Sequence, residues 1–273
     1  MTTQFASWES IIWNGEKAYQ SAVGGSLAIV SPTRGRLVHF GSYGTGRNLL
    51  YSPTGLNKDF GGHRFWLGPQ RIWNWPPPID WERSQANCHL SGEALTLELP
   101  HTAPQFPRIT RRYFWSGSKL ACSCEWQPSA TDHYAMHVLA VPRAERIKLR
   151  IQKSDSTPHG YLTIGLETNH PTSSPAIRTN DQNAIIDPSK VSSDGVKLGF
   201  PVQTICFESE RGTLSMEHGI YSGLNSAEID SAYRSQIWCS NDSEFTELEQ
   251  ISPVLEATSG EKVSHTIYLS ATA

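Results

Sequence analysis

The stretch Gly61-Gly-His-Arg-Phe-Trp-Leu-Gly-Pro69 combines a β-strand pattern with side chains suited to a binding site. Its two leading glycines permit a positive φ or a close backbone approach, which lets a loop enter a strand and leave a pocket open in front of it. Because successive side chains of a strand point to opposite faces, Arg64 and Trp66 should share one face, while His63 and Phe65 point to the other. The stretch therefore predicts a strand that lines a pocket.

Short strand patterns continue along the whole chain and set the expected fold class. They are rich in β-branched and aromatic residues, often alternate, and are separated by Gly, Pro, Asn and Ser. Clear examples are Ser26–Val30, Ala94–Leu99, Ile147–Ile151, Gln203–Phe207 and His265–Leu269. Helical periodicity is confined to Ser226–Trp238, where we expect one helix. Since no low-complexity linker divides the sequence, residues 1–273 are expected to form one all-β, antiparallel domain.

Composition excludes several classes of protein. The 273 residues are 38% hydrophobic and 18% charged, with a formal net charge of −3, so a packed core is expected rather than disorder. No Lys/Arg cluster forms a basic stripe, which argues against a nucleic-acid partner. No apolar run approaches the ~20 residues of a membrane span, and no signal peptide is evident, so we expect no membrane partner and a cytoplasmic location.

The five cysteines indicate neither a disulfide framework nor a metal site. An odd number in a chain of this size suits reduced thiols in a cytoplasm. Cys122 and Cys124 would share one face of a strand, but no second Cys/His pair has zinc-ligand spacing. No metal and no cofactor are therefore expected, and the oligomeric state stays open.

Tryptophans cluster beside the opening stretch. Four of the nine fall between positions 61 and 81, whereas Trp8, Trp13, Trp115, Trp126 and Trp238 are dispersed and are explained by packing. An arginine beside an indole resembles a site for a polyhydroxylated ligand, because planar donors bind hydroxyls and the ring covers an apolar face. The candidate binding residues are His63, Arg64, Trp66, Gln70 and Arg71. The alternative is a structural arginine stacked on a core tryptophan.

Two carboxylates near the C-terminus are candidates for acid/base chemistry. In Ser243–Pro253, alternation places Phe245, Glu247 and Glu249 on one face. Carboxylates two residues apart on a strand lie ~7 Å from each other, close enough for each to raise the proton affinity of the other in a partly dry site. Such a carboxylate can act as a general base near neutral pH. The alternative is a solvated strand face.

A proton donor would come from the ten histidines. His133 and His137 should share one face of a strand in Asp132–Val141, which turns apolar after Met136. A histidine that leads into a buried strand is held rigidly and can be oriented through its second ring nitrogen. His137 is the preferred acid and His133 the alternate, although either could be a satisfied core histidine.

Together these motifs resemble an uncharacterised bacterial family within the galactose mutarotase-like (aldose 1-epimerase-like) superfamily. Its members carry a Gly-Gly-His-Arg-x-Trp stretch near the first quarter and a Glu-Leu-Glu stretch before the last strand. The matching residues are Gly61–Trp66 and Glu247–Glu249, the latter followed by Ser259-Gly-Glu261. The resemblance implies a single-domain antiparallel β-supersandwich with a concave face that binds sugars.

The resemblance also implies a reaction. Aldose 1-epimerases of the superfamily use a late glutamate to remove the proton of the anomeric hydroxyl, while a histidine protonates the ring oxygen and the ring opens. The glutamate maps onto Glu249, with Glu247 as fallback, and the arginine onto Arg64. The acid maps onto His137 by strand order, with His63 as another choice, because the Asn-His motif of true galactose mutarotases is absent at Asp132–Val141.

Two functions are therefore expected for a small-molecule carbohydrate ligand. One is an aldose 1-epimerase (mutarotase)-like isomerase of carbohydrate metabolism that acts on the anomeric centre by acid/base ring opening. The alternative is a non-catalytic carbohydrate-binding protein on the same fold. Glycosidic cleavage is disfavoured, since hydrolases place their two carboxyls on opposite sides of the bond, whereas Glu247 and Glu249 share one strand.

Overall fold

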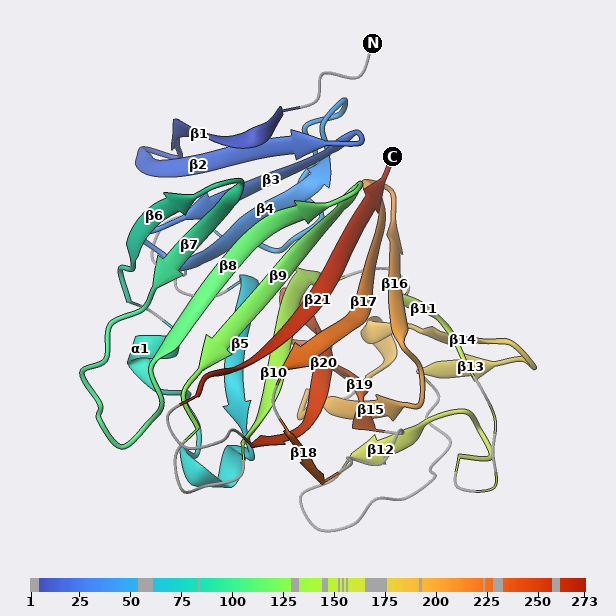
Figure 1. Ribbon diagram of the computed structural model, residues 1–273. Helices are drawn as coiled ribbons and strands as arrows, with labels where there is room; N and C mark the ends of the chain where they lie inside the picture. The colour runs from blue at the N-terminus through green and yellow to red at the C-terminus, as the bar shows by residue number, and fades with distance from the viewer. Residues whose placement is uncertain are drawn as a thin grey trace.

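Nearly all regular structure in the chain is antiparallel β (Figure 1). The computed structural model describes residues 5–53, 61–82, 84–128, 133–143, 147–151, 153, 155, 157–164, 176–191, 193–222, 224–227, 233–256 and 261–273. Within these residues the helical elements are the four-residue helix α1 (Ile79–Glu82) and the 3-10 turns η2 (Gln70–Ile72) and η3 (Pro188–Lys190). None of the described helices has the length and apolar character needed to cross a membrane.

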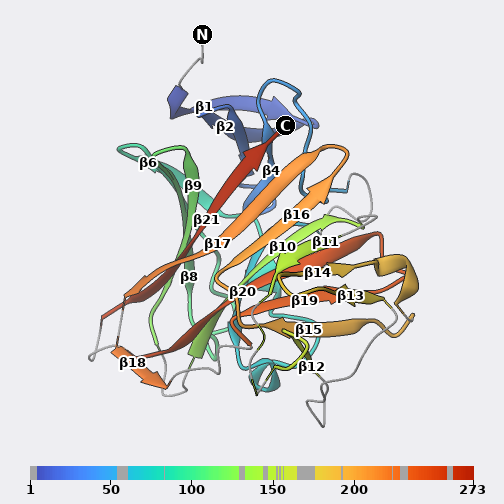
Figure 2. The ribbon, with the colours of Figure 1, turned by 90° about the vertical axis from the view of Figure 1, so that its right-hand side faces the viewer.

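The N-terminal strands form a four-stranded sheet with the order β1-β2-β3-β4. Its strands are β1 (Phe5–Trp13), β2 (Glu16–Val23), β3 (Ser26–Ser31) and β4 (Arg36–Ser42). Figures 1 and 2 both show this sheet, in blue, at one end of the two larger sheets.

A ten-stranded sheet runs in the order β13-β14-β11-β16-β17-β21-β9-β8-β7-β6. Its strands are β6 (Asn87–Ser91), β7 (Ala94–Glu98), β8 (Ile109–Ser116), β9 (Lys119–Trp126), β11 (Ile147–Arg150), β13 (Ile177–Thr179), β14 (Asn183–Ile186), β16 (Thr204–Ser209), β17 (Gly212–Ser222) and β21 (Val263–Thr272).

The third sheet contains Gly62–Gly68, the strand formed by the glycine-led stretch. It runs in the order β12-β15-β19-β20-β10-β5, with β18 also paired to β20. Its strands are β5 (Gly62–Gly68), β10 (His133–Pro142), β12 (Leu162–Ile164), β15 (Val196–Phe200), β18 (Leu224–Ala227), β19 (Ser235–Cys239) and β20 (Phe245–Glu256).

The two larger sheets pack face to face around one apolar core. Phe65 of β5 meets Trp126 of β9 with ring centroids 5.9 Å apart, and His137 of β10 meets His265 of β21 at 4.9 Å. All four side chains are buried. Because alternate side chains of a strand point to opposite faces, the residues next to Phe65 and His137 lie on the outer face of the seven-stranded sheet, away from this core.

The all-β antiparallel fold class is confirmed. The five strand patterns named above lie largely within β3, β7, β11, β16 and β21. The helix expected over Ser226–Trp238 is wrong: Leu224–Ala227 and Ser235–Cys239 are strands, and residues 228–232 lie outside the described part of the chain. β19 hydrogen-bonds to β15 on one side and β20 on the other, and this pairing overrides a weak local helical pattern.

Candidate functional site

Strand β5 enters the sheet through two glycines that no other residue could replace without movement. Gly61 and Gly62 have φ of +94° and +68°. A Cβ on Gly61 would lie 2.2 Å from the carbonyl oxygen of Tyr51, and one on Gly62 would lie 2.3 Å from that of Leu37. The close backbone approach expected from the sequence is therefore present, and it fixes where the next side chains project.

Three adjacent strands bring the charged candidates to the outer face of the seven-stranded sheet. In the register of β10, Val138 lies between Arg64 of β5 and Glu249 of β20. Ala140 is likewise the β10 partner of Glu247. These two short side chains leave room above β10, so Arg64 can reach across it to β20.

Glu82, at the end of α1, holds the arginine and the first tryptophan of the site in place. The indole Nε1 of Trp66 donates to Glu82 Oε2 at 2.8 Å, while the guanidinium nitrogens of Arg64 and Arg36 lie 3.4 and 3.5 Å from Oε1. Burial raises the pKa of Glu82, but the two cations outweigh that effect and leave the pKa below its usual value. Glu82 therefore stays ionised as a buried anchor.

Glu82 was not among the site residues expected from the sequence. The residue follows Trp81 in a short helix, and nothing in its spacing connects it with Arg64. Only its place at the end of the tryptophan cluster could have pointed to it.

Glu247 is paired with Arg64. The Nη2 group of Arg64 donates to Glu247 Oε1, which ties β5 to β20. The Glu247 side chain is buried, so the solvated-strand alternative does not hold for it. Burial and the nearby charge of Glu249 raise the pKa of Glu247, although Arg64 acts in the opposite direction.

Glu249 is paired with Lys197, which was not among the site residues expected from the sequence. The ammonium Nζ of Lys197, on β15, lies 2.8 Å from Glu249 Oε2, and the Glu249 side chain is only 1% exposed. Burial lowers the pKa of Lys197, but Glu249 outweighs this, so the pKa is raised and the ammonium stays charged. The alternation in Val196–Phe200 could have placed Lys197 on the outer face, opposite the buried Leu198 and Phe200.

These charged groups lie in a pocket of about 270 Å³ with aromatic walls. Trp75, 61% exposed, meets the ring of Trp66 edge-on with centroids 6.0 Å apart. Trp238 and Phe245 form another aromatic pair, with centroids 6.0 Å apart. The lining residues are Arg64, Trp66, Gln70, Trp75, Lys197, Trp238, Phe245, Glu247 and Glu249.

Most of the tryptophan cluster is buried; Trp66 lines the pocket, and its expected role in binding stays a prediction. Trp66 is 3% exposed, its N–H is used by Glu82, and the Arg64 guanidinium stacks 4.9 Å from its ring centroid. The indoles of Trp73 and Trp81 likewise donate to backbone carbonyls. Trp75 is the exposed ring of the cluster. Trp238, assigned above to packing, lines the pocket.

The three candidate histidines lie on the core side of the seven-stranded sheet, as the alternative of a core histidine expected. His63 and His137 point into the core, where His63 Nε2 and His137 Nδ1 lie 2.9 Å apart and both side chains are fully buried. His133 shares the inward face, with its Nδ1 3.3 Å from the Gly68 carbonyl oxygen. The outer-face pocket therefore lies across the sheet from all three, and no histidine lines it among the described residues.

Gln70 and Arg71 both lie in η2 and are exposed. Gln70 lines the pocket, whereas Arg71 is absent from its described lining.

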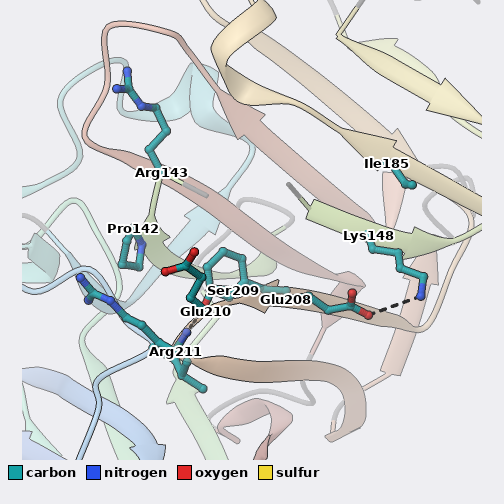
Figure 3. Close-up of a pocket in the computed structure, with 10 residues that line it drawn as sticks. Pro142, Arg143, Lys148, Ile185, Glu208, Ser209, Glu210 and Arg211 are labelled. Atoms are coloured by element: carbon teal, nitrogen blue, oxygen red, sulfur yellow. Dashed lines mark hydrogen bonds and ion pairs between the residues drawn. The ribbon is translucent and has the colours of Figure 1, made fainter. Parts of the chain in front are cut away.

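Another concavity, of about 530 Å³, lies where β10 ends near β11 and β16. Figure 3 shows its Lys148–Glu208 ion pair, with 3.5 Å between Nζ and Oε1. Both side chains are about half exposed, so the pair contributes little, and no buried charged group converges on this concavity. The described residues contain no group of three or more His, Cys, Asp or Glu side chains that could hold a metal ion.

No family model matches the sequence, and no curated protein matches it. Solved structures do match. A galactose mutarotase-like protein from Lactobacillus casei ATCC 334 superposes with a TM-score of 0.65 at 9% identity, covering 93% of this chain and 100% of that one. An Escherichia coli K12 protein proposed to be an aldose 1-epimerase gives 0.58 at 12% identity, covering 93% and 99%.

A galactose mutarotase related enzyme from Lactobacillus acidophilus gives a TM-score of 0.57 at 7% identity, covering 94% of this chain and 97% of that one. Likenesses at such low identity reflect shared architecture. They show that the chain has the galactose mutarotase-like fold, in agreement with the resemblance found in the sequence.

Proposed function

We propose that this chain, which has the galactose mutarotase-like fold, binds a neutral carbohydrate in the pocket above Glu247 and Glu249. The observation that carries the proposal is the combination of aromatic walls with a floor of buried charged groups. Sugars present apolar C–H faces to aromatic rings and hydroxyls to planar donors and acceptors. Trp75 supports the proposal further, because its indole lines the pocket and is 61% exposed, so its ring is open to a ligand.

The charge balance of the floor favours a neutral sugar over a phosphorylated one. Its two lining cations, Arg64 and Lys197, are already paired with Glu247 and Glu249. A phosphate would add negative charge beside the Glu247 and Glu249 carboxylates, which already balance the two cations, and the repulsion between like charges opposes its binding.

Calorimetric titration with glucose, galactose, mannose and glucose 6-phosphate tests this proposal. We expect at least one neutral sugar to bind and glucose 6-phosphate to bind more weakly than glucose. Trp75→Ala should weaken binding about tenfold, whereas Tyr43→Ala, which removes an exposed ring elsewhere, should leave it unchanged. Equal binding by the two variants would argue against this pocket.

A second candidate function is aldose 1-epimerase activity, favoured by the contact between Glu249 and Lys197 on the pocket floor. The Glu249 carboxylate would take the proton of the anomeric hydroxyl as the bond between C1 and the ring oxygen breaks. The Lys197 ammonium would give its proton to that ring oxygen, which yields the open-chain aldehyde. Rotation about the C1–C2 bond followed by the reverse proton transfers then closes either anomer.

Polarimetry of freshly dissolved α-glucose and α-galactose tests this second candidate. Catalysed mutarotation should be lost in both Glu249→Gln and Lys197→Met and kept in Glu98→Gln, which alters an exposed glutamate. If wild type and buffer give equal rates while the titrations show binding, the protein binds these sugars without turning them over.

A further inference from the structure

We propose that the site takes a chain of at least two sugar units, with the terminal unit above Glu247 and Glu249 and the next unit in a neighbouring pocket. This inference rests on the proposed carbohydrate-binding function and extends it from a single sugar to an oligosaccharide.

The first support is that the two pockets are adjacent. The charged pocket measures about 270 Å³, slightly below the ~300–1,000 Å³ typical of small-molecule sites. A second pocket of about 600 Å³ shares Gln70, Lys197 and Trp238 with it. Because the same three side chains line both, the two pockets are adjacent, and one ligand of two linked units can be placed with a unit in each.

The second support is the chemistry of the neighbouring pocket. Asp194 and Gln236 supply polar groups beside the apolar side chains of Met136 and Ile164. Like the first pocket, this pocket combines hydrogen-bonding groups with an apolar surface, and that combination suits a sugar.

Tyr134 adds an aromatic ring to the neighbouring pocket through a specific fit. A Cβ on Gly68, its cross-strand partner in β5, would lie 2.0 Å from the Tyr134 ring, so the glycine lets that ring lie directly over β5. Burial raises the pKa of Tyr134, and its phenolic hydroxyl can donate to a sugar oxygen.

The indole ring of Trp238 lines both pockets, and other residues pack against it on two sides. A Cβ on Gly195, which has a φ of +80°, would lie 3.0 Å from the indole Nε1, so the turn before β15 fits against this ring. Phe245 packs near it as well, with centroids 6.0 Å apart. A ring fixed in this way can stack against a sugar at the point where two units join.

Calorimetry with matched saccharide series tests the inference. The probes are glucose with maltose, maltotriose, cellobiose and cellotriose, and mannose and galactose with their α- and β-linked disaccharides. In the series that binds, the disaccharide should bind at least tenfold more tightly than its monosaccharide.

Ile164→Trp, which fills the neighbouring pocket, and Asp194→Ala, which removes a polar group there, should abolish or reduce that gain. Both should leave monosaccharide affinity unchanged. Ile12→Trp adds an indole at a position that is 75% exposed on β1 and serves as the matched control, so its gain should be that of wild type.

The outcomes separate the two proposals. Equal affinity for monosaccharide and disaccharide, or a gain in affinity that persists in Ile164→Trp, would overturn the proposal that the second pocket binds a sugar unit. The proposal that the first pocket binds a sugar would still stand. Absence of binding by every saccharide in the panel would overturn the proposed carbohydrate function itself, and the second pocket with it.

Discussion

The ammonium of Lys197 lies 2.8 Å from the Glu249 carboxylate and so joins β15 to β20 across the intervening strand β19. In the sheet register, Lys197 is the partner of Trp238 and Glu249 is the partner of Gln236, so the lysine side chain crosses β19 diagonally. One ion pair therefore fixes a carboxylate and a cation in the same pocket and holds three strands together.

Replacement of Lys197 should lower the free energy of unfolding by more than the loss of its packing contacts alone would. Lys197→Met leaves the Glu249 carboxylate buried without its cation, which should cost about 3 kcal/mol of unfolding free energy. The double variant Lys197→Met/Glu249→Gln removes both charges and should recover at least about 1 kcal/mol relative to the sum of the singles. Urea denaturation of the four proteins measures this coupling; purely additive effects would show that the pair is not energetically linked.

Glu82 should be among the carboxylates whose replacement most lowers the free energy of unfolding. Glu82→Gln removes the charge that neutralises the buried guanidiniums of Arg36 and Arg64, so we expect a loss of about 3 kcal/mol. Glu98→Gln, whose ion pair with Arg108 is about half exposed, should cost less than about 1 kcal/mol. The same urea titrations compare the two. Similar losses for both variants would mean that Glu82 does not anchor the site.

The sequence predicted the fold well because the fold depends on local alternation and turn punctuation. Alternation also placed Arg64 with Trp66, and Phe245 with Glu247 and Glu249, on common faces, and the structure brings all five to one pocket. The pairing of strands distant in sequence could not be read in this way. Lys197 reaches the pocket only through that pairing, and Glu82 reaches Arg64 and Trp66 only through α1.

The sequence left the position of the histidines open for a related reason. Alternation shows that His133 and His137 share a face, but it does not say which face of the sheet meets the core. Because Glu249 lies on the opposite face of the same sheet, a one-residue difference in strand position decides between pocket and core. Trp75 was missed as the exposed ring because the sequence does not rank the members of a tryptophan cluster by burial.

The glycine at the entry of β5 should be far less replaceable than a turn glycine with a similar φ. Gly62→Ala places a Cβ 2.3 Å from the Leu37 carbonyl oxygen, so the backbone must move, whereas Gly25→Ala meets nothing within 4 Å. With φ of +68° and +85°, both substitutions carry a backbone strain of about 1 kcal/mol. Thermal unfolding should therefore show the larger loss for Gly62→Ala. Equal losses would mean that the β5 entry adapts freely.

The core histidines should make the fold sensitive to acid. His63, His137 and His265 are fully buried, and burial lowers the pKa of each well below 6.5. They stay neutral in the folded protein while the unfolded chain takes up protons below pH ~6.5, so unfolding is favoured as the pH falls through that value. At one pH unit below ~6.5, each of these histidines should lower the free energy of unfolding by about 1.4 kcal/mol.

His265→Phe isolates this effect, because neither ring nitrogen of His265 has a hydrogen-bond partner among the described residues. Phenylalanine is similar in shape and removes two buried unpaired polar atoms, so the variant should be at least as stable as wild type at pH 7.5. Between pH 7.5 and 5.5 it should lose about 1.4 kcal/mol less than wild type in urea titrations. His89→Phe, at an exposed position, should keep the wild-type pH dependence. A His265→Phe protein with unchanged pH dependence would show that His265 is protonated in the folded state, in conflict with its burial between the two sheets.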